Sequence, residues 1–415
     1  MSKRRVVVTG LGIVSPLGND VKEYYQSLLA GKSGISNITG FDVSDYTTQI
    51  AGEIKEFDAT GYLDKKQARR VDKFIAYSVY AAKKALENAG FDEQVRASTN
   101  PSKCGVIIGS GMGGMQKFVE NVQTMDNRGH TKVSPFFIPF VITNMGGAMT
   151  AMEVGFMGPN YSISTACATG NNSIIAAANH IVKGEADVML AGGAEAPILP
   201  IGVAGFIACR ALSKRNDQPE RASRPWDTDR DGFVIGEGAG VLLLESLDHA
   251  LGRRAPIYAE YLGGGVSCDA HHMTEPRADG EGVAQCIRNA LNDAGVNADD
   301  VNYVNAHATS TPVGDMAEVN AVKKVLTNPG NVVMNATKSM IGHGLGAAGG
   351  QEAVVCVEAI QQGVVHPTLN LENPENGLDF VVPTQAMELD VNVAISNSFG
   401  FGGHNATLVF KKFEK

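Results

Sequence analysis

The stretch STACATGNN at residues 164–172 has the form of a sharp turn that leads into a helix of small residues. A second stretch of similar form, KSMIGHGLGAAGGQE, occupies residues 338–352 in the other half of the chain. Each half also begins with an apolar run beside a predicted glycine-rich turn, RVVVTGLG at 5–12 and APIYAEYLGGG at 255–265. We interpret this similarity as an internal duplication.

The join between the two halves is predicted near Leu247–Ala255, where LDHALGRRA is typical of a connector. The halves are therefore expected to cover residues 1–250 and 251–415. The chain has 415 residues, more than the ~250–300 at which a single hydrophobic core usually stops growing. Two fused halves of one fold account for that length.

Short apolar runs alternate with helical patterns along the chain, which predicts an α/β fold. The predicted strands are Arg5–Val8, Gly105–Ile108, Val188–Ala191, Val241–Leu244, Tyr258–Tyr261, Tyr303–Asn305, Val332–Met334, Val393–Ser396 and Ala406–Phe410. The predicted helices are Lys73–Asn88, closed by Ala89-Gly90, and Asn172–Lys183, Gly282–Asp293, Met316–Leu326 and Gly350–Gln361.

Composition excludes several classes of protein. The net charge of −9 argues against a protein that coats nucleic acid, which would be basic. No apolar run reaches the ~18 residues that a membrane span requires, and the opening MSKRRVVVTG is too short in apolar residues for a signal peptide. The six cysteines form no CxxC pair, so reduced intracellular thiols are expected.

Cys167 is a candidate nucleophile because it stands where the turn at residues 164–170 opens a helix. Unpaired backbone N–H groups and the positive end of the helix dipole meet a thiol at such a place, and both favour the thiolate. A buried structural cysteine is the alternative, and the turn alone does not separate the two.

Three further turns follow predicted strands and carry polar or glycine-rich sequences. They are NAHATSTP at 305–312, NATKSMIGHG at 335–344 and NSFGFGGHN at 397–405. Ligand-binding groups of α/β folds gather at the carboxyl ends of strands, which favours a shared site. Buried structural histidines and an ordinary glycine-rich β-turn are the alternatives.

These motifs together resemble the β-ketoacyl-[acyl-carrier-protein] synthases of the I/II type over essentially the whole chain. TACATG, RDGFVIGEGAG, NAHATSTPVGD, NATKSMIGHGLGAAGG and SNSFGFGGHN occur in that order. The resemblance implies a thiolase fold, with duplicated halves stacked in five α-β-α-β-α layers, and a homodimer. It also implies the condensing reaction of type II fatty acid synthesis.

The resemblance assigns roles residue by residue. Cys167 would accept the acyl chain, and His307 and His343 would promote malonyl decarboxylation and stabilise the enolate. Lys338 and Glu352 would support the histidines. The remaining implied positions are the backbone N–H groups of Cys167 and Phe401 as an oxyanion hole, Phe399 and Phe401 at the gate, and Thr309 and Thr311 as ligands of the phosphopantetheine arm.

The implied reaction begins with transfer of an acyl chain from acyl carrier protein to Cys167. Malonyl-acyl carrier protein then loses CO2 and attacks the acyl thioester, which gives 3-oxoacyl-acyl carrier protein extended by two carbons. Covalent catalysis divides one difficult bond formation into two easier steps. The resemblance implies no metal and no organic cofactor, and no nucleic-acid or membrane partner.

Positive charge concentrates at Lys65, Lys66, Arg69, Arg70 and Lys73, at helical spacing. An acidic acyl carrier protein would fit this patch, and a solvated helix face is the alternative. Weaker additions to it are Arg128, Lys132, Arg210, Lys214 and Arg215. The acyl pocket is expected at Ile108, Met112, Phe137 and Phe140, which ordinary core packing explains equally well.

Two departures from the family pattern bear on subtype and location. Ala308 stands where many relatives have glycine, and His404 where many bacterial members have threonine. Both residues are features of plastid and cyanobacterial-like members. They leave the preferred acyl chain length and the I or II label open. A cytoplasmic protein is expected, or a plastid-stromal one if a transit peptide has been removed.

Other functions fit the residues less well. A degradative thiolase would have a second cysteine near the C-terminal glycine-rich turn, whereas the last cysteine is Cys356. An initiating synthase would have Asn at position 343, and a chain-length factor would lack Cys167.

Metal sites are not supported either, because DTDRDG at 227–232 lacks the calcium loop's glutamate and the Cys268, His271 and His272 group lacks a second ligand pair.

Overall fold

The computed structural model describes residues 3–414 and contains all nine predicted strands, most of them longer than expected. They are β1 (Val6–Val14), β4 (Cys104–Gly109), β5 (Val188–Glu195), β6 (Gly238–Ser246), β7 (Ala259–Cys268), β8 (Tyr303–Asn305), β9 (Val333–Asn335), β12 (Val393–Gly400) and β13 (His404–Lys411). They form one sheet in the order β4-β5-β6-β1-β7-β13-β12-β8-β9.

The strand order repeats between the two halves. In the first half β1 is antiparallel to β6, β6 is antiparallel to β5, and β5 is parallel to β4. In the second half β7, β13, β12 and β8 have the same order and the same directions. The duplication is therefore confirmed, whereas the boundary between residues 250 and 251 stays a prediction.

The half-sheets meet where β1 pairs with β7 over three residue pairs, from Val6 with Tyr261 to Val8 with Ala259. Beyond β8 the second half adds the parallel strand β9. Within residues 3–250, the corresponding place has one parallel bridge, between Val106 and Asn160. Residues 160–163, of which Asn160 alone makes a bridge to β4, therefore take the place of that edge strand and lead directly into the Cys167 turn.

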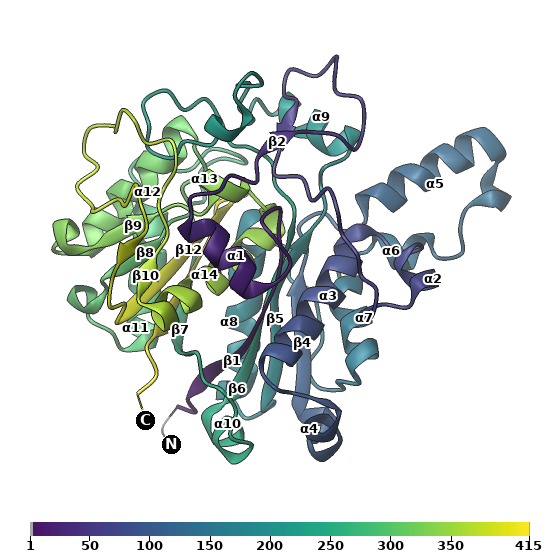
Figure 1. Cartoon of the computed structure of the whole chain (residues 1–415), viewed down its shortest axis with the longest axis horizontal. Helices are drawn as coiled ribbons and strands as arrows, with labels where there is room; N and C mark the ends of the chain where they lie inside the picture. The colour runs from purple at the N-terminus through teal and green to yellow at the C-terminus, as the bar shows by residue number, and fades with distance from the viewer. Residues whose placement is uncertain (1–2, 415) are drawn as a thin grey trace.

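Five layers follow one another from left to right in Figure 1. The helices α11 (Glu281–Ala294) and α12 (Pro312–Val325) form one outer layer, and α3 (Lys73–Asn88) and α7 (Met145–Val154) form the other. Between the half-sheets lie α8 (Thr169–Val182) and α14 (Ala348–Gln362), which contact both of them. The expected α-β-α-β-α arrangement is confirmed.

The glycines of RVVVTGLG lie inside β1 and not in a turn, so that part of the prediction is wrong. A Cβ on Gly10 would lie 2.1 Å from the Ala85 carbonyl oxygen, and one on Gly12 would lie 1.8 Å from the Ala81 carbonyl oxygen. Glycine is needed because α3 packs directly on the strand backbone. Gly265 in β7 meets α11 in the same way, 2.3 Å from the Ala290 nitrogen.

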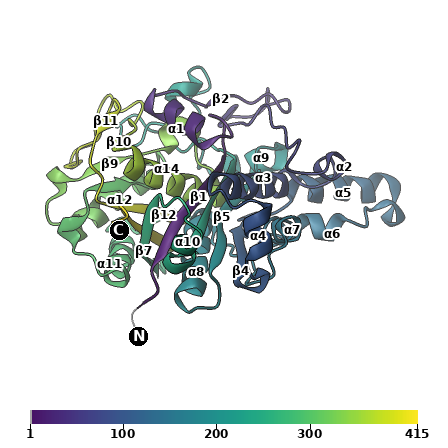
Figure 2. The same cartoon turned by 60° about the horizontal axis from the view of Figure 1, so that its bottom comes forward.

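The remaining elements surround this core. They are α1 (Val21–Leu29), α2 (Lys65–Ala68), α4 (Glu93–Ser98), α5 (Met115–Arg128), α6 (Phe137–Val141), α9 (Pro200–Ala208), α10 (Leu247–Gly252), α13 (Lys338–Ile341), and the short strands β2 (Ser36–Asn37), β3 (Ile50–Ala51), β10 (Val364–Val365) and β11 (Met387–Glu388). The predicted connector is the helix α10, and α5 and α6 project from one side in Figure 2. Within residues 3–414, no helix has the length and apolar character needed to cross a bilayer.

Candidate active site

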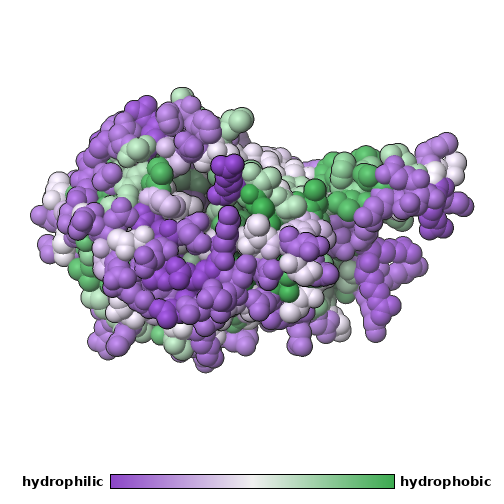
Figure 3. Space-filling view, turned by 90° about the horizontal axis from the view of Figure 1, so that it is seen from above, coloured by the Kyte–Doolittle hydropathy of each residue, from purple (hydrophilic) through white to green (hydrophobic). Residues whose placement is uncertain are grey.

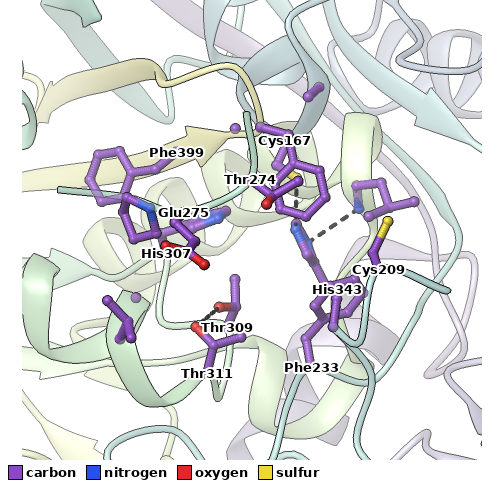
Figure 4. A pocket seen from close by; sticks show the side chains of 18 of the residues that line it. Cys167, Cys209, Phe233, Thr274, Glu275, His307, Thr309, Thr311, His343 and Phe399 are labelled. Carbon is purple, nitrogen blue, oxygen red and sulfur yellow. Dashed lines mark hydrogen bonds between the residues drawn. The ribbon is translucent and has the colours of Figure 1, made fainter. Parts of the chain in front are cut away.

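A cavity of about 800 Å³ opens where the two halves meet, and segments from both halves line it. Cys167 reaches it from the first half, on the short helical turn Ala166–Ala168 that precedes α8. His307 follows β8, His343 follows α13, and Phe399 lies near the end of β12. Figure 4 shows these side chains directed into one space, so the four predicted turns converge.

Cys167 and the two histidines form a tight group. The Sγ atom of Cys167 lies 3.0 Å from Nε2 of His343. The ring centroids of His307 and His343 are 5.2 Å apart, and the rings are nearly perpendicular. One donor atom from each of the three side chains lies within 4.8 Å of the others, and all three side chains are buried.

Hydrogen bonds on the far side of each ring determine which nitrogen carries the proton. The backbone N–H of Leu345 donates to Nδ1 of His343 at 3.3 Å. The Lys338 ammonium, which has only donors, lies 3.3 Å from Nδ1 of His307. Both Nδ1 atoms are therefore acceptors, and the neutral rings carry their hydrogens on Nε2, beside Cys167.

This proton arrangement suits a developing anion better than a metal ion. A metal bound by the two Nε2 atoms would need lone pairs at positions where the hydrogens stand. Among residues 3–414, Cys167, His307 and His343 are the only group close enough to hold an ion. Cys268, His271 and His272 do not form such a group.

Lys338 and Glu352 form a buried ion pair behind His307. The Lys338 ammonium is 2.5 Å from Oε1 of Glu352, and both side chains are 1% exposed. Burial raises the pKa of Glu352 to about 7, and the Lys338 charge acts in the opposite direction. The pair holds a donor against His307 in a place that water does not reach.

Burial also determines the protonation of the three central groups. It raises the pKa of the Cys167 thiol to about 12, while the Lys338 charge and the Phe401 N–H act in the opposite direction. The helix terminus is expected to favour the thiolate, but desolvation is the larger effect on the pKa of this thiol. Burial and then the Lys338 charge hold the pKa of both histidines well below the ordinary value.

Phe401 and Phe399 lie at the predicted gate. The backbone N–H groups of Phe401 and Cys167 both lower the pKa of the Cys167 thiol, so they lie beside the sulfur that would carry an acyl group. The Phe399 ring meets the His307 ring edge to face at a centroid distance of 5.4 Å. A Cβ on Gly400 would lie 3.0 Å from the Cys167 nitrogen, so the gate strand and the cysteine turn are in direct contact.

The turn after β8 carries Thr309 and Thr311, whose hydroxyl oxygens are 3.1 Å apart and face the cavity (Figure 4). Its backbone is strained, since Ala308 has φ of +22° and Ser310 has φ of +68°. The Glu318 carboxylate accepts hydrogen bonds from the N–H groups of His307 and Ala308. The turn is thus held rigidly with its threonines toward the entrance.

Comparison with known families shows which family the chain belongs to. Residues 3–250 match the N-terminal domain of β-ketoacyl synthases, and residues 258–372 match the C-terminal domain. The chain belongs to the β-ketoacyl synthase family. The resemblance that the motifs indicate is confirmed.

Relatives match over nearly the whole chain. The chloroplastic 3-oxoacyl-[acyl-carrier-protein] synthase I of Arabidopsis thaliana is 58% identical over 413 residues, which cover 99% of this chain and 87% of the relative. The chloroplastic synthase II of the same plant is 55% identical over 414 residues, with 99% and 76% covered. The crystal structure of a β-ketoacyl synthase from Burkholderia phymatum STM815 matches with a TM-score of 0.92 at 34% identity, covering 99% and 100% of the two chains.

The acyl-pocket residues expected for this family are only partly brought together. Met112 lines the main cavity and also a smaller apolar one beside it. Ile108 is buried in β4, where it packs into the core with α3. Phe137 packs against Phe118, and Phe140 stacks on Phe136. Ile108, Phe137 and Phe140 do not line either cavity of the single chain, so the pocket prediction is supported only for Met112.

The five basic residues of the predicted carrier-protein patch are all exposed, but they do not share one helix face. Lys65 and Lys66 lie on α2, which ends at Ala68, and Lys73 begins α3. Asp64 and Asp72 cap the two helices separately, so the chain turns between them. The charges therefore cover a bend in the surface.

Several residues that support the site were not among the predicted ones. Glu195 lines the cavity at the end of β5, and Glu318 and Asp315 lie on α12 beneath the threonine turn. Glu195 follows a buried strand just as the predicted turns do, so the same rule would have found it. Glu318 and Asp315 gave no comparable signal, because an acidic residue on a helix is usually exposed.

Proposed function

We propose that this chain is a condensing enzyme of type II fatty acid synthesis, which extends an acyl chain by two carbons. The observation that best supports this function is that a buried thiol, two Nε2–H donors and two backbone N–H groups meet in one cavity. A nucleophile and donors for two successive oxyanions are thereby provided within one site.

In the first half-reaction the Cys167 sulfur bonds to the acyl carbon of an acyl-carrier thioester. The bond between that carbon and the carrier's sulfur breaks, and the carrier thiol leaves with the proton that Cys167 loses. The N–H groups of Cys167 and Phe401 stabilise the negative oxygen of the tetrahedral intermediate. Buried surroundings strengthen this electrostatic stabilisation.

In the second half-reaction malonyl-acyl carrier protein loses CO2, and the electron pair of the broken bond becomes the enolate. The Nε2–H groups of His307 and His343 donate to the enolate oxygen. Its carbon then attacks the acyl carbon on Cys167, and the thiolate is released. Lys338 and Leu345 contribute by keeping each Nδ1 as an acceptor, which keeps the hydrogens on the cavity side.

The partner proposed for the basic patch at α2 and the start of α3 is an acyl carrier protein. Lys65, Lys66, Arg69, Arg70 and Lys73 are exposed, so they are free to meet an acidic surface. Only Arg70 is engaged with an aromatic ring, with its guanidinium 5.9 Å from the centroid of Phe136. The names of the plant relatives also refer to a carrier protein.

A second copy of this chain is the proposed partner at the edge near residues 160–163. Among residues 3–414, no strand pairs with the outer side of that segment. Large exposed apolar side chains lie near it and on the projecting arm, whose inner part carries a green patch at the right of Figure 3 while its tip is purple. They include Phe136, Ile138, Ile142, Met152, Met157 and Ile201. An open edge with an apolar surround favours association.

The oligomer is tested by light scattering of the purified chain, with Met157→Asp against Leu251→Asp. Both side chains are exposed, and Leu251 lies on α10 away from the arm. We expect a dimer that Met157→Asp weakens and Leu251→Asp does not. A monomeric wild type would contradict the proposal.

The proposed location is the cytoplasm, or the plastid stroma, because both plant relatives are named as chloroplastic. Cell fractionation with an antibody to the chain tests this. Recovery in the membrane fraction after a salt wash would contradict it.

The reaction is tested by mixing the purified chain with acyl-acyl carrier protein and malonyl-acyl carrier protein, and by detecting 3-oxoacyl-acyl carrier protein by mass spectrometry. Acyl groups from C4 to C18 define the preferred chain length. We expect product from the wild type and none from Cys167→Ala. Equal product from both proteins would overturn the assignment.

A further inference from the structure

Glu195 is a buried carboxylate at the edge of the cavity with four hydrogen-bond donors around it. Oε2 accepts from the N–H of Gly111 at 2.7 Å and from that of Gly346 at 3.2 Å. Oε1 accepts from the Ser110 hydroxyl at 2.7 Å and from the Met112 N–H at 3.2 Å. The side chain is 1% exposed, so these bonds replace its hydration.

The four donors belong to segments that are far apart in the sequence. Residues 110–112 form the loop after β4, which carries Met112 into both cavities. Gly346 lies in the segment that follows His343, in the other half of the chain. These segments approach closely, since a Cβ on Gly346 would lie 2.4 Å from Glu195 Oε2 and 2.8 Å from the Gly111 nitrogen. Glu195 therefore bridges the two halves beside the reacting groups.

Leu345, between His343 and Gly346, connects the Glu195 bridge to the His343 imidazole. Its backbone is left-handed, with φ of +51°, although it is not glycine. Such a conformation is unfavourable for a residue with a Cβ and persists only where neighbouring contacts hold it. The Leu345 N–H is the donor to Nδ1 of His343, and the next N–H along the chain, that of Gly346, is the one that Glu195 binds.

We infer that Glu195 is a positioning residue that holds the Leu345–Gly346 backbone so that His343 keeps its Nε2–H directed at Cys167. The inference rests on the proposed function, because it assigns Glu195 to the condensation step. Loss of the bridge lets Leu345 relax, which removes the donor to Nδ1 and frees the ring to change tautomer. Acylation of Cys167 does not need that tautomer, since its oxyanion donors are backbone N–H groups.

Two substitutions separate the bridge from the negative charge. Glu195→Gln places its oxygen toward Gly111 and Gly346, whose N–H groups cannot turn, and its NH2 toward Ser110, whose hydroxyl can accept. This orientation gives up the longer hydrogen bond from the Met112 N–H, at 3.2 Å. The bridge survives and the charge does not. Glu195→Ala removes both. Ser110→Ala is the matched control, because it removes one donor to Oε1 and leaves the Gly111–Gly346 bridge in place.

The experiment measures the two half-reactions separately, with wild type and Cys167→Ala in parallel. Glu195→Ala is expected to acylate within about threefold of wild type and to condense about 100-fold more slowly, the loss typical of a displaced catalytic group. Glu195→Gln and Ser110→Ala are expected within about fivefold of wild type in both steps. Equal losses in both half-reactions, or Glu195→Gln as impaired as Glu195→Ala, would overturn the inference.

A spectroscopic readout keeps the test decisive if Glu195→Ala does not fold. In protein labelled with 15N-histidine, wild type and Glu195→Gln are both expected to show His343 with an unprotonated Nδ1. A changed tautomer in Glu195→Gln contradicts the inference. Condensation by Cys167→Ala would instead contradict the proposed function, so the two failures are distinguishable.

Discussion

The Nε2 atom of His343 lies 3.0 Å from the Sγ atom of Cys167, although 176 residues separate the two in the sequence. The cysteine belongs to the first half of the duplicated fold and the histidine to the second. Each lies in a turn that precedes one of the two central helices, α8 and α14. The two halves thus bring a nucleophile and a hydrogen-bond donor together just before the two central helices.

His343→Ala is expected to separate the two half-reactions. Acylation of Cys167 continues, because the backbone donors remain, whereas condensation falls about 10²–10³-fold through loss of an enolate donor. Intact-protein mass spectrometry detects the acyl-enzyme, and product analysis detects the condensation. Normal condensation by an acylated His343→Ala protein would show that this imidazole has no such role.

Lys338→Met is expected to destabilise the fold because it leaves Glu352 buried and unpaired. Breaking one partner of a buried pair costs about 3–5 kcal/mol, and Lys338→Met/Glu352→Met is expected to recover most of it. Urea unfolding measures the free energy of unfolding of the single and the double variant. Lys323→Met is the control, since its partner Asp379 is largely exposed and the expected loss is about 1 kcal/mol or less. A double mutant no more stable than the single one would contradict this account.

Alkylation of Cys167 by iodoacetamide is expected to accelerate with pH. Burial raises the pKa of this thiol to about 12, so the reactive thiolate is the minor form at neutral pH. Its fraction then rises about tenfold for each pH unit below that pKa. Peptide mass spectrometry follows the rate at Cys167 between pH 6 and 9. A plateau within that range would mean that the thiolate is already dominant, contrary to the effect of burial.

Charge reversal at the basic patch is expected to weaken carrier-protein use without damaging the active site. Lys66→Glu with Arg70→Glu is predicted to raise KM for acyl-acyl carrier protein about tenfold or more at low salt. Turnover of a short pantetheine thioester remains unchanged. Lys412→Glu is the control, because this exposed lysine lies near the C-terminus, outside the patch. Equal KM values for the wild type, the double variant and Lys412→Glu would mean that the patch is an ordinary solvated surface.

Much of the architecture could be predicted because it depends on local sequence patterns. The bounds of α3 agree at both ends, since Asp72 caps its start and Ala89-Gly90 closes it. The turns around Cys167, His307 and His343 share a cavity because strand ends of one sheet converge. Local patterns therefore located both the elements and the groups at their ends.

The features that the sequence did not predict depend on long-range packing. The protonation of Cys167 follows from burial by other segments of the chain, among them those of Ile38, Phe233 and Leu345, and a turn sequence does not record it. Glu195 receives its donors from residues 110–112 and 346, so neither neighbourhood alone indicates the bridge. The position of Phe137 depends on a projecting arm whose helices have weak signals. In each case the decisive contact lies between distant parts of the chain.

We propose above all that Cys167 carries the acyl chain into the product. The most direct measurement is a single-turnover chase: the enzyme is loaded with a labelled acyl group, freed of donor, and mixed with malonyl-acyl carrier protein. We predict that the label leaves Cys167 and appears in 3-oxoacyl-acyl carrier protein at the rate of condensation. Label that stays on Cys167 while product forms, or product formed by Cys167→Ala, would contradict the claim.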